Sequence, residues 1–410
     1  MRILFIIHQF MPEFLSGTER FTLNIAKLHQ HNGHRVHILT CSVSDGSLWA
    51  DEVAGLRYVV IDGVPVYGLP RALLGHLAEI GADDGGATKP LISAFLDRGG
   101  YDVVHVTHSM RMLPAIDVVR ERSIPYLITL TDYFSICYRT NLKRVDGDIC
   151  SGPRQGTSCK IHCSNATMTE DVIRARWERF SSLLFSAAEV VGCSTFITGI
   201  FQQEFPDLPI RTLNHGIDLL RFPRVTTDRK TAPLVFGFIG TLSEAKGVHV
   251  LAEAFARAHC GDARLELVGP AYNNHEFLDR VTALGGPRIS IRSAVEHSEI
   301  PEVLASFDVL CIPSLWPEPG SLALREGFAA GLPALVSDTG WPAQVVRESL
   351  CGKTVPVGDV AAWQHAIEEI GGNRTLLQQW GKNVPMQLRV EEESFFYDQL
   401  YRRAHLCRRN

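Results

Sequence analysis

One stretch of the chain, residues 311 to 338, constrains the fold more than any other. A buried-strand pattern runs from Val309 to Ile312, and the residues from Leu322 to Ala330 have the propensities of a helix. A second short apolar run, Pro333 to Val336, follows that helix. The stretch therefore predicts a strand–loop–helix–strand unit of the kind that builds α/β domains.

Two carboxylates, separated by seven residues, stand in this unit. Glu318 is predicted in the loop and Glu326 about two turns into the helix. The amides of Gly320, Ser321 and Leu322 would lie at the helix N-terminus, where the helix dipole favours an anion. Carboxylates beside an anion site suit a ligand with both hydroxyl and phosphate groups, such as a sugar nucleotide. The alternative is a helix N-terminus decorated with solvated acids.

The stretch resembles the E-x7-E motif of the retaining glycosyltransferases of family 4, the glycosyl transferases group 1, which have the GT-B fold. Members usually read P-S-x-x-E-x-x-G-x-x-x-x-E-A-x-A-x-G-x-P. The matching residues are Pro313, Ser314, Glu318, Glu326, Ala329, Gly331 and Pro333, with a Leu-Trp-Pro insert before the first glutamate. The resemblance implies that Glu318 binds donor-sugar hydroxyls and Glu326 the nucleotide ribose. It also implies an α/β chain whose two Rossmann-like domains face each other across a cleft.

Length and composition fit that architecture. The 410 residues suit two domains of roughly 200 residues each. A formal net charge of −5 argues against broad nucleic-acid binding, and no apolar run reaches the ~18 residues of a membrane span. The apolar start of the chain is interrupted at His8 and predicts a first buried strand, not a secretory signal. Ten cysteines without a signal segment therefore predict reduced thiols or metal ligands, in a cytoplasmic protein.

The N-terminal segment predicts a βαβ opening, with a strand over residues 2–7 and a second over Val36–Leu39. It resembles the family's opening, H-x-F-x-P-x-x-x-G-G-x-E followed by G-H-x-V, although Ser16 replaces the first glycine. The resemblance implies that Gly17 contacts the donor diphosphate. An ordinary helix cap, Thr18 with Glu19 in the first turn, would explain the same residues.

Two further buried strands end in polar residues. The strand from Tyr101 to Val106 ends at Thr107 and His108, and the next ends at Thr131 and Asp132. Both ends should open onto the crevice where parallel α/β sheets bind ligands. Many family members carry a histidine in place of Thr131, so its absence leaves His108 or Asp132 as candidate catalytic substitutes. Either could equally be a polar strand-end residue.

A polar, turn-rich segment of 27 residues carries Cys137, Cys150, Cys159 and Cys163. Such a loop has no core of its own, and four thiolates match a closed structural Zn²⁺ site, in which His162 could replace one ligand. Free thiols in a loop are the alternative. A similar insert occurs in family members of the bacterial surface-polysaccharide type, which this chain therefore resembles.

The helix predicted over residues 170 to 187 carries Arg174, Arg176 and Arg179 beside apolar residues. This basic face could lie on an anionic membrane that holds a lipid-linked acceptor, which would make the protein peripheral at the inner face. A solvated charged face is the alternative.

The predicted domains follow from these elements. Asn214 to Asp218 resembles the family's N-G-[VI]-D signature at the domain junction. Four parts are expected: an acceptor-side Rossmann-like domain (1–217) with its cysteine-rich insert (137–163), a linker (218–232), a nucleotide-sugar-binding Rossmann-like domain (233–385), and a C-terminal helix that crosses back to the first domain (386–410).

The second domain opens with a strand and the sequence G-T-L-S-E-A-K-G. Family members usually read G-R-L-x-x-x-K-G, with arginine and lysine gripping the diphosphate. Lys246 matches, and Thr241 takes the place of the arginine. A lysine suits a phosphate as a point charge, although a surface lysine near a helix start is the alternative.

The resemblance therefore implies a retaining, hexosyltransferase-type enzyme that uses a nucleotide-diphosphate sugar and a glycan or lipid-linked acceptor. Lys246 and Glu318 are expected to carry the chemistry, with no catalytic metal because no suitable loop has a D-x-D signature. Two alternatives stay open. A sugar-nucleotide epimerase has the same architecture, and a catalytically silent donor-binding subunit would explain Thr131 and Thr241.

Overall fold

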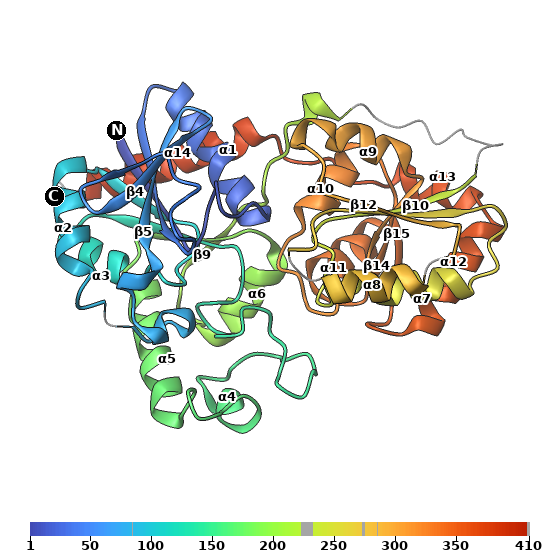
Figure 1. Ribbon diagram of the computed structural model, residues 1–410, viewed down its shortest axis with the longest axis horizontal. Coiled ribbons are helices and arrows are strands. Elements are labelled where there is room, and N and C mark those ends of the chain that lie inside the picture. The colour runs from blue at the N-terminus through green and yellow to red at the C-terminus, as the bar shows by residue number, and fades with distance from the viewer. Residues whose placement is uncertain (84, 223–232, 273–274, 285, 408–410) are drawn as a thin grey trace. The chain divides into compact units, whose positions relative to one another are not determined.

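Alternating strand and helix patterns build two α/β sheets, one largely and one wholly parallel, in the computed structural model, which describes residues 1–83, 85–222, 233–272, 275–284 and 286–407. The chain divides into unit 1, Met1–His215 with Val390–Asn410, and unit 2, Gly216–Arg389. The part of the predicted linker at 223–232 lies outside the described residues. Figure 1 shows both units, with the strands of each flanked by helices.

Unit 1 contains a nine-stranded sheet in the order β3-β4-β5-β2-β1-β6-β7-β8-β9, in which β3–β4 and β4–β5 pair antiparallel. Its strands are β1 (Arg2–Ile7), β2 (Arg35–Ser42), β3 (Asp51–Val53), β4 (Leu56–Ile61), β5 (Val64–Pro70), β6 (Val103–Val106), β7 (Tyr126–Leu130), β8 (Glu189–Gly192) and β9 (Ile210–Thr212). Its helices are α1 (Gly17–His31), α2 (Lys89–Gly99), α3 (Leu113–Glu121), α4 (Thr157–His162), α5 (Glu170–Phe185), α6 (Thr195–Glu204) and α14 (Val390–Cys407).

The central strand β1 is buried over five consecutive apolar residues, as expected for a parallel strand covered on both faces. The strand order reverses between β1 and β6, which pair directly. The carboxyl ends of β1, β6 and β7 therefore meet at a topological switch point, where open α/β sheets bind ligands.

Unit 2 contains a six-stranded parallel sheet in the order β12-β11-β10-β13-β14-β15. Its strands are β10 (Val235–Ile239), β11 (Arg264–Val268), β12 (Ile289–Arg292), β13 (Val309–Ile312), β14 (Ala334–Ser337) and β15 (Gly352–Val355). Its helices are α7 (Val248–Arg257), α8 (His275–Leu284), α9 (Ile300–Ser306), α10 (Leu322–Ala329), α11 (Gly340–Ser349), α12 (Val360–Gly372) and α13 (Thr375–Lys382). The order reverses between β10 and β13, so the carboxyl ends of these two strands form the second switch point.

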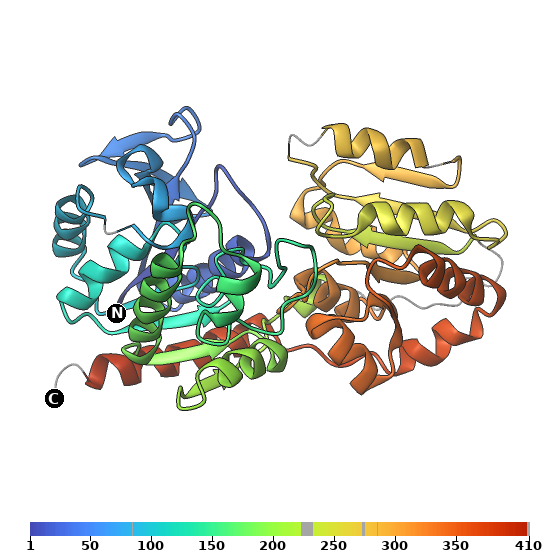
Figure 2. The same ribbon diagram turned by 90° about the horizontal axis from the view of Figure 1, so that it is seen from below.

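Helix α14 follows unit 2 in the sequence but packs into the core of unit 1 (Figure 2). Tyr397 and Tyr401 are fully buried there. Both ring nitrogens of His105 in β6 are hydrogen-bonded, one to the Tyr401 hydroxyl at 2.6 Å and one to Thr129 Oγ1 at 2.7 Å. The hydroxyl of Tyr397 lies 2.8 Å from the same Thr129 oxygen. This buried network fixes the helix against β6 and β7, because an unpaired polar group at that depth would be costly.

A second buried contact lies where the chain leaves unit 1 and returns to it. His215 Nδ1 lies 3.0 Å from Glu393 Oε1, and both side chains are buried. Burial alone lowers the pKa of His215, but hydrogen bonds to Cys193 and Glu393 and the charge of Glu393 outweigh it and raise this pKa to about 9. The imidazolium and the carboxylate therefore form an ion pair at neutral pH.

The prediction of a basic face on residues 170–187 is wrong for two of its three arginines, Arg176 and Arg179, which do not point into solvent. Arg176 is buried and donates to the carbonyl oxygens of Ile80 and Phe134, and Arg179 pairs with Asp117. These side chains point inward because they share the side of α5 that packs on unit 1. Among the described residues, no helix is long and apolar enough to cross a membrane.

The His215–Glu393 pair predicts a pH dependence of stability. Because the folded-state pKa of about 9 exceeds the unfolded value of about 6.5, the stabilisation is complete below pH 6.5 and is lost as the pH rises toward 9. We expect wild-type protein to lose on the order of 2–3 kcal/mol across this window through this pair. Urea unfolding over a pH series should show this decline, and Glu393→Gln should flatten it.

The control is Glu391→Gln, because Glu391 is exposed on the same helical turn. That variant should keep the wild-type slope. A Glu393→Gln protein with the wild-type slope would contradict the ion pair.

Candidate functional site

The loops that follow β10 and β13 meet at the switch point of unit 2. The N–H of Leu315 donates to the carbonyl oxygen of Ala245 at 2.9 Å, which joins the two loops through the main chain. Directly beside this bond, Lys246 Nζ lies 2.7 Å from Glu318 Oε1. The structure thus brings together two residues that the sequence places 72 positions apart.

Two glycines make this approach possible. At Gly247, with φ +68°, a Cβ atom would lie 1.9 Å from the carbonyl oxygen of Pro313. At Gly340, with φ +69°, it would lie 2.5 Å from the backbone nitrogen of Glu318. The N–H of Trp341 then donates to the Glu318 carbonyl at 2.8 Å. The backbone of Glu318 is therefore clamped between its own loop and the start of α11.

The Glu318 carboxylate is 3% exposed and accepts hydrogen bonds from Lys246 and from the Ser314 hydroxyl. The Lys246 side chain is 30% exposed, and its ammonium lies 5.7 Å from the centre of the Trp316 ring. An ammonium has three N–H donors, so the contact with Glu318 uses one of them. The site thus presents a fixed positive charge to solvent, held by a buried anion and an aromatic face.

Helix α10 begins next to this pair. Ser321 is its N-cap and accepts the N–H of Leu324 at 3.4 Å, so Gly320, Ser321 and Leu322 lie at the helix N-terminus as predicted. Glu326 is buried and is the fifth residue of α10. It therefore lies little more than one turn into the helix and not two, because the helix starts four residues after Glu318.

Thr241 lies at the same edge of the sheet. It follows Gly240, whose carbonyl oxygen would lie 1.9 Å from a Cβ atom at Gly269. The N–H of Leu242 also donates to the Pro270 carbonyl at 2.8 Å. The loops after β10 and β11 are thereby packed backbone to backbone. Thr241 is half-buried at this edge of the sheet, five residues before Lys246.

The switch point of unit 1 joins His108 and Asp132. His108 Nε2 lies 2.7 Å from Asp132 Oδ2, while the N–H of Met110 donates to His108 Nδ1 at 3.2 Å. The proton of the neutral ring is therefore assigned to Nε2 and donated to the carboxylate. The Asp132 side chain is 21% exposed and the His108 side chain 4%. Of the two, the carboxylate is the group that a ligand can reach.

His8, at the end of β1, is a site residue that the sequence analysis used only to end an apolar run. Its ring stacks on His108 with the centres 3.7 Å apart. Burial, followed by the charges of His108 and Arg111, holds the pKa of His8 well below its usual range. The His8 ring is thus uncharged and stacks on the ring of His108. The sequence signal that could have identified His8 as a site residue is its position directly after a buried strand.

Gly17 is the first residue of α1 and lies in unit 1. The cap of this helix is Ser16, not Thr18: the Ser16 N–H donates to Glu19 Oε2 at 2.7 Å, and its hydroxyl contacts the same oxygen. The prediction that Thr18 caps this helix was therefore wrong, because the N-cap is Ser16. Ser16 forms a reciprocal cap with the buried Glu19, in the place where the family pattern has a glycine.

The four cysteines of the cysteine-rich segment lie in and around helix α4 of unit 1. Cys159 lies in α4 and Cys163 directly follows it, while Cys137 and Cys150 come from the preceding loop. Main-chain N–H groups donate to three of the four sulfurs, including Gly152 to Cys150 at 3.4 Å. Burial, and then the charges of the other three thiols, raise the pKa of Cys159 to about 12. The four thiols therefore share one neighbourhood, although no three of these described residues come within 4.8 Å of one another.

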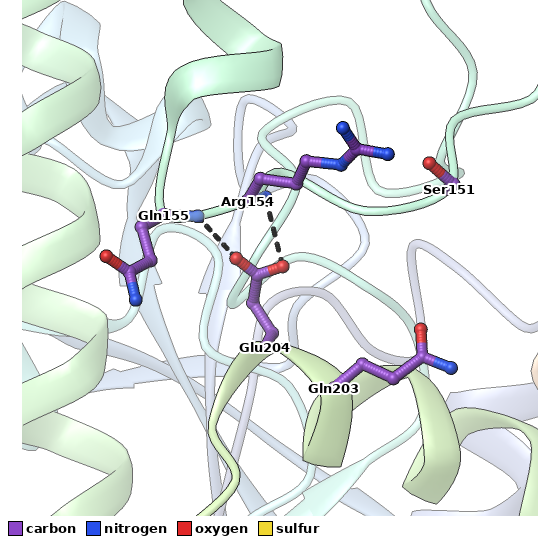
Figure 3. Close-up of a pocket in the computed structure, with 5 residues that line it drawn as sticks. All are labelled: Ser151, Arg154, Gln155, Gln203 and Glu204. Atoms are coloured by element: carbon purple, nitrogen blue, oxygen red, sulfur yellow. Dashed lines mark hydrogen bonds between the residues drawn. The ribbon is translucent and has the colours of Figure 1, made fainter.

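Glu204, at the end of α6, anchors the loop between Cys150 and Cys159. Its carboxylate accepts the main-chain N–H groups of Arg154 and Gln155 (Figure 3). These residues line a polar pocket of about 460 Å³ together with Ser151 and Gln203. The carboxylate holds the loop, and its two main-chain contacts indicate a structural role.

Solved structures share this architecture. Sucrose-phosphate synthase from Thermosynechococcus elongatus superimposes with a TM-score of 0.73 at 17% identity, over 99% of each chain. Anabaena HepE, solved in complex with UDP and glucose, superimposes with a TM-score of 0.69 at 17% identity, over 97% of this chain and 99% of its own. The protein has the GT-B fold.

Family models identify the class more closely. Residues 224–386 match the model of glycosyl transferases group 1, and residues 16–207 match the glycosyl transferase 4-like domain. The chain belongs to the group 1, GT4-like glycosyltransferases. Spore coat protein SA of Bacillus subtilis is 27% identical over 192 residues, which are 41% of this chain and 51% of that protein. The match thus spans about half the length of this relative.

The close approach at Gly340 predicts a substitution that disturbs the candidate site around Glu318. We expect Gly340→Ala to push the Glu318 backbone away from α11 and to weaken nucleotide-sugar binding by about tenfold or more, which corresponds to roughly 1.4 kcal/mol. Calorimetric titration with the nucleotide sugar selected by a thermal-shift panel measures this change.

Gly358→Ala is the matched control. Gly358 has nearly the same φ, +72°, but a Cβ there would meet only the Leu315 side chain at an ordinary 3.7 Å. Both variants carry the backbone strain of an alanine at positive φ, roughly 1 kcal/mol. Equal losses of affinity in the two variants would show that strain, and not the displacement of Glu318, is responsible.

Proposed function

We propose that the protein is a retaining glycosyltransferase that moves a sugar from a nucleotide-diphosphate donor to a glycan or lipid-linked saccharide. The observation that carries this proposal is the contact of Lys246 with the buried Glu318 at the switch point of unit 2, beside the start of α10. A fixed cation, a helix N-terminus and two carboxylates at one sheet edge match the chemistry of a sugar diphosphate.

Each group has a part in donor binding. Lys246 and the amides of Gly320, Ser321 and Leu322 are assigned to the diphosphate, with Thr241 at the same edge of the unit 2 sheet. Glu318 is assigned to the sugar hydroxyls and Glu326 to the ribose. Because Lys246 is fixed by Glu318 before the donor arrives, it can stabilise the departing diphosphate with little reorganisation.

The transfer breaks the bond between the sugar C1 and the diphosphate oxygen and forms a bond from C1 to the acceptor oxygen. The acceptor proton passes to the departing phosphate on the same face of the sugar, which retains the anomeric configuration. Lys246 supplies the positive charge that the leaving group needs, so the proposal includes no catalytic metal.

The acceptor hydroxyl is assigned to Asp132. His108 uses Nε2 to hold this carboxylate and has its other nitrogen engaged by Met110, so it is a positioning residue. The neutral His8 ring supports His108 from its other face. In this arrangement Asp132 takes over the contact for which many family members use a histidine at the position of Thr131.

The two assignments predict variants that separate binding from turnover. Lys246→Ala and Glu326→Ala should weaken donor binding, because each removes a group that touches the donor. Asp132→Asn should leave donor affinity within about twofold and lower kcat by about 10²-fold or more, the scale of a misplaced reactant, because the carboxylate that orients the acceptor hydroxyl is lost. Calorimetry with the donor and a turnover assay with lipid-linked and free glycan acceptors measure the two effects, and the anomeric configuration of the product tests retention.

Two exposed residues serve as controls: Lys353→Ala in unit 2 and Asp97→Asn in unit 1, each of which loses a surface ion pair. Wild-type activity in both Lys246→Ala and Glu326→Ala would refute the donor site. Release of free or epimerised sugar without an acceptor would favour the epimerase, and donor binding without turnover would favour the silent subunit.

We also propose that Cys137, Cys150, Cys159 and Cys163 hold a structural Zn²⁺. The support is their shared neighbourhood, the N–H groups that donate to their sulfurs, and the buried Arg176, whose charge acts on Cys137 and Cys159. A Zn²⁺ with four thiolates has a net negative charge that this arginine would balance.

The zinc proposal predicts a thiolate signature. Cobalt-substituted protein should show sulfur-to-cobalt charge-transfer absorption, and Cys159→Ser should lose most of it. Cys41→Ser, which changes a buried cysteine elsewhere in unit 1, should keep it. Absence of the band from wild-type protein would count against the site.

A further inference from the structure

His29, near the end of α1, is fully buried, yet neither of its ring nitrogens has a hydrogen-bond partner among the residues that the structure describes. Most buried polar side chains are paired, and an unpaired one in a native protein indicates an unseen water or ion. A neutral imidazole has one ring nitrogen with a lone pair that can bind a metal ion.

Two other metal-binding groups surround this ring. One ligand atom each from His29, His34 and Asp398 lie within 4.8 Å of one another, and among the described residues no other three His, Cys, Asp or Glu side chains do so. His34 Nε2 lies 3.1 Å from Asp398 Oδ1. His34 precedes β2, and Asp398 comes from α14, which lies along α1 (Figure 1).

We propose that His29, His34 and Asp398 bind a divalent transition-metal ion, zinc by the nature of the ligands, which fastens α14 to α1. Two imidazoles and one carboxylate are a common zinc ligand set that leaves a fourth position for water. In a tetrahedral zinc site neighbouring ligand atoms lie about 3.4 Å apart, because Zn–N and Zn–O distances are near 2.1 Å. His34 Nε2 and Asp398 Oδ1, at 3.1 Å, are close to this spacing.

The surroundings orient the ligands without occupying the atoms they need. Asp398 Oδ2 accepts Arg402 at 2.6 Å, which leaves Oδ1 facing the histidines. The amino group of Met1 lies 3.1 Å from His34 Nδ1, so Nε2 is the nitrogen turned toward the ion. Such outer contacts fix ligand orientation in metal sites. The side chains of His34 and Asp398 are 8% and 15% exposed, which gives an ion a route from solvent.

The inferred ion is independent of sugar transfer. It joins the α1–β2 connection to α14, which brings Tyr397 and Tyr401 into the core of unit 1. An ion that binds the folded protein and not the unfolded chain raises the melting temperature by mass action. The expected property is therefore zinc-dependent stability of unit 1.

The experiment uses full-length protein stripped with a chelator and dialysed. Adding Zn²⁺ at 100 times its dissociation constant should raise the Tm by about 5 °C or more. His29→Leu should abolish this part of the zinc response. Its metal-free form should be no less stable than metal-free wild type, because leucine removes an unpaired buried polar group.

His31→Ala, an exposed histidine on the same helix, is the control and should respond like wild type. Cys159→Ser should also keep the response that His29→Leu loses, which separates this site from the cysteines. If His29→Leu does not fold, Asp398→Asn takes its place. A His29→Leu or Asp398→Asn protein that gains as much Tm from zinc as wild type, or a wild type without any gain, overturns the proposal.

Discussion

The ion pair of Lys246 with Glu318 is the interaction on which the candidate site depends. A carboxylate that is 3% exposed is costly to keep charged unless a cation and hydrogen bonds offset its lost hydration. Lys246 and Ser314 supply these contacts, and the pair in turn fixes the position of the lysine. The geometry is possible because Gly247 and Gly340 let three loops touch through their backbones. The ion pair and the close packing of the backbone thus both fix the position of Glu318.

Much of this could be predicted from the sequence, and the limits have physical causes. The periodicity of apolar residues located most strands, and the resemblance of the residues around Glu318, Glu326 and Lys246 to family motifs singled out the two loops that meet at the switch point of unit 2. Exposure could not be predicted for Arg176, because a charged residue on a helix is normally solvated and only the carbonyls around it in three dimensions make burial tolerable. Stacking between His8 and His108 was likewise invisible, since it joins two strands that are far apart in sequence.

Two buried histidines of unit 1, His105 and His215, differ in charge because their surroundings shift their pKa values in opposite directions. His105 is hydrogen-bonded to hydroxyl groups, and burial, with smaller contributions from His29 and His215, lowers its pKa to about 3. For His215, the contact with Glu393 reverses the effect of burial. Both histidines face α14, so this helix is held by a neutral hydrogen-bonded network and by an ion pair. The two kinds of contact respond differently to pH, although they hold the same element.

The threonine at position 131 is compatible with a working site because of what it does to its neighbours. Its hydroxyl donates to the Thr107 carbonyl at 2.9 Å, which joins the ends of β6 and β7. That bond fixes the two residues that follow, His108 and Asp132, at hydrogen-bonding distance. A histidine side chain at position 131 would be too long to make the same short contact with the Thr107 carbonyl. With threonine at position 131 the crevice lacks a histidine ring there, but the Asp132 carboxylate one residue later is held in a fixed position. The presence of Thr131 therefore does not by itself argue for a silent subunit.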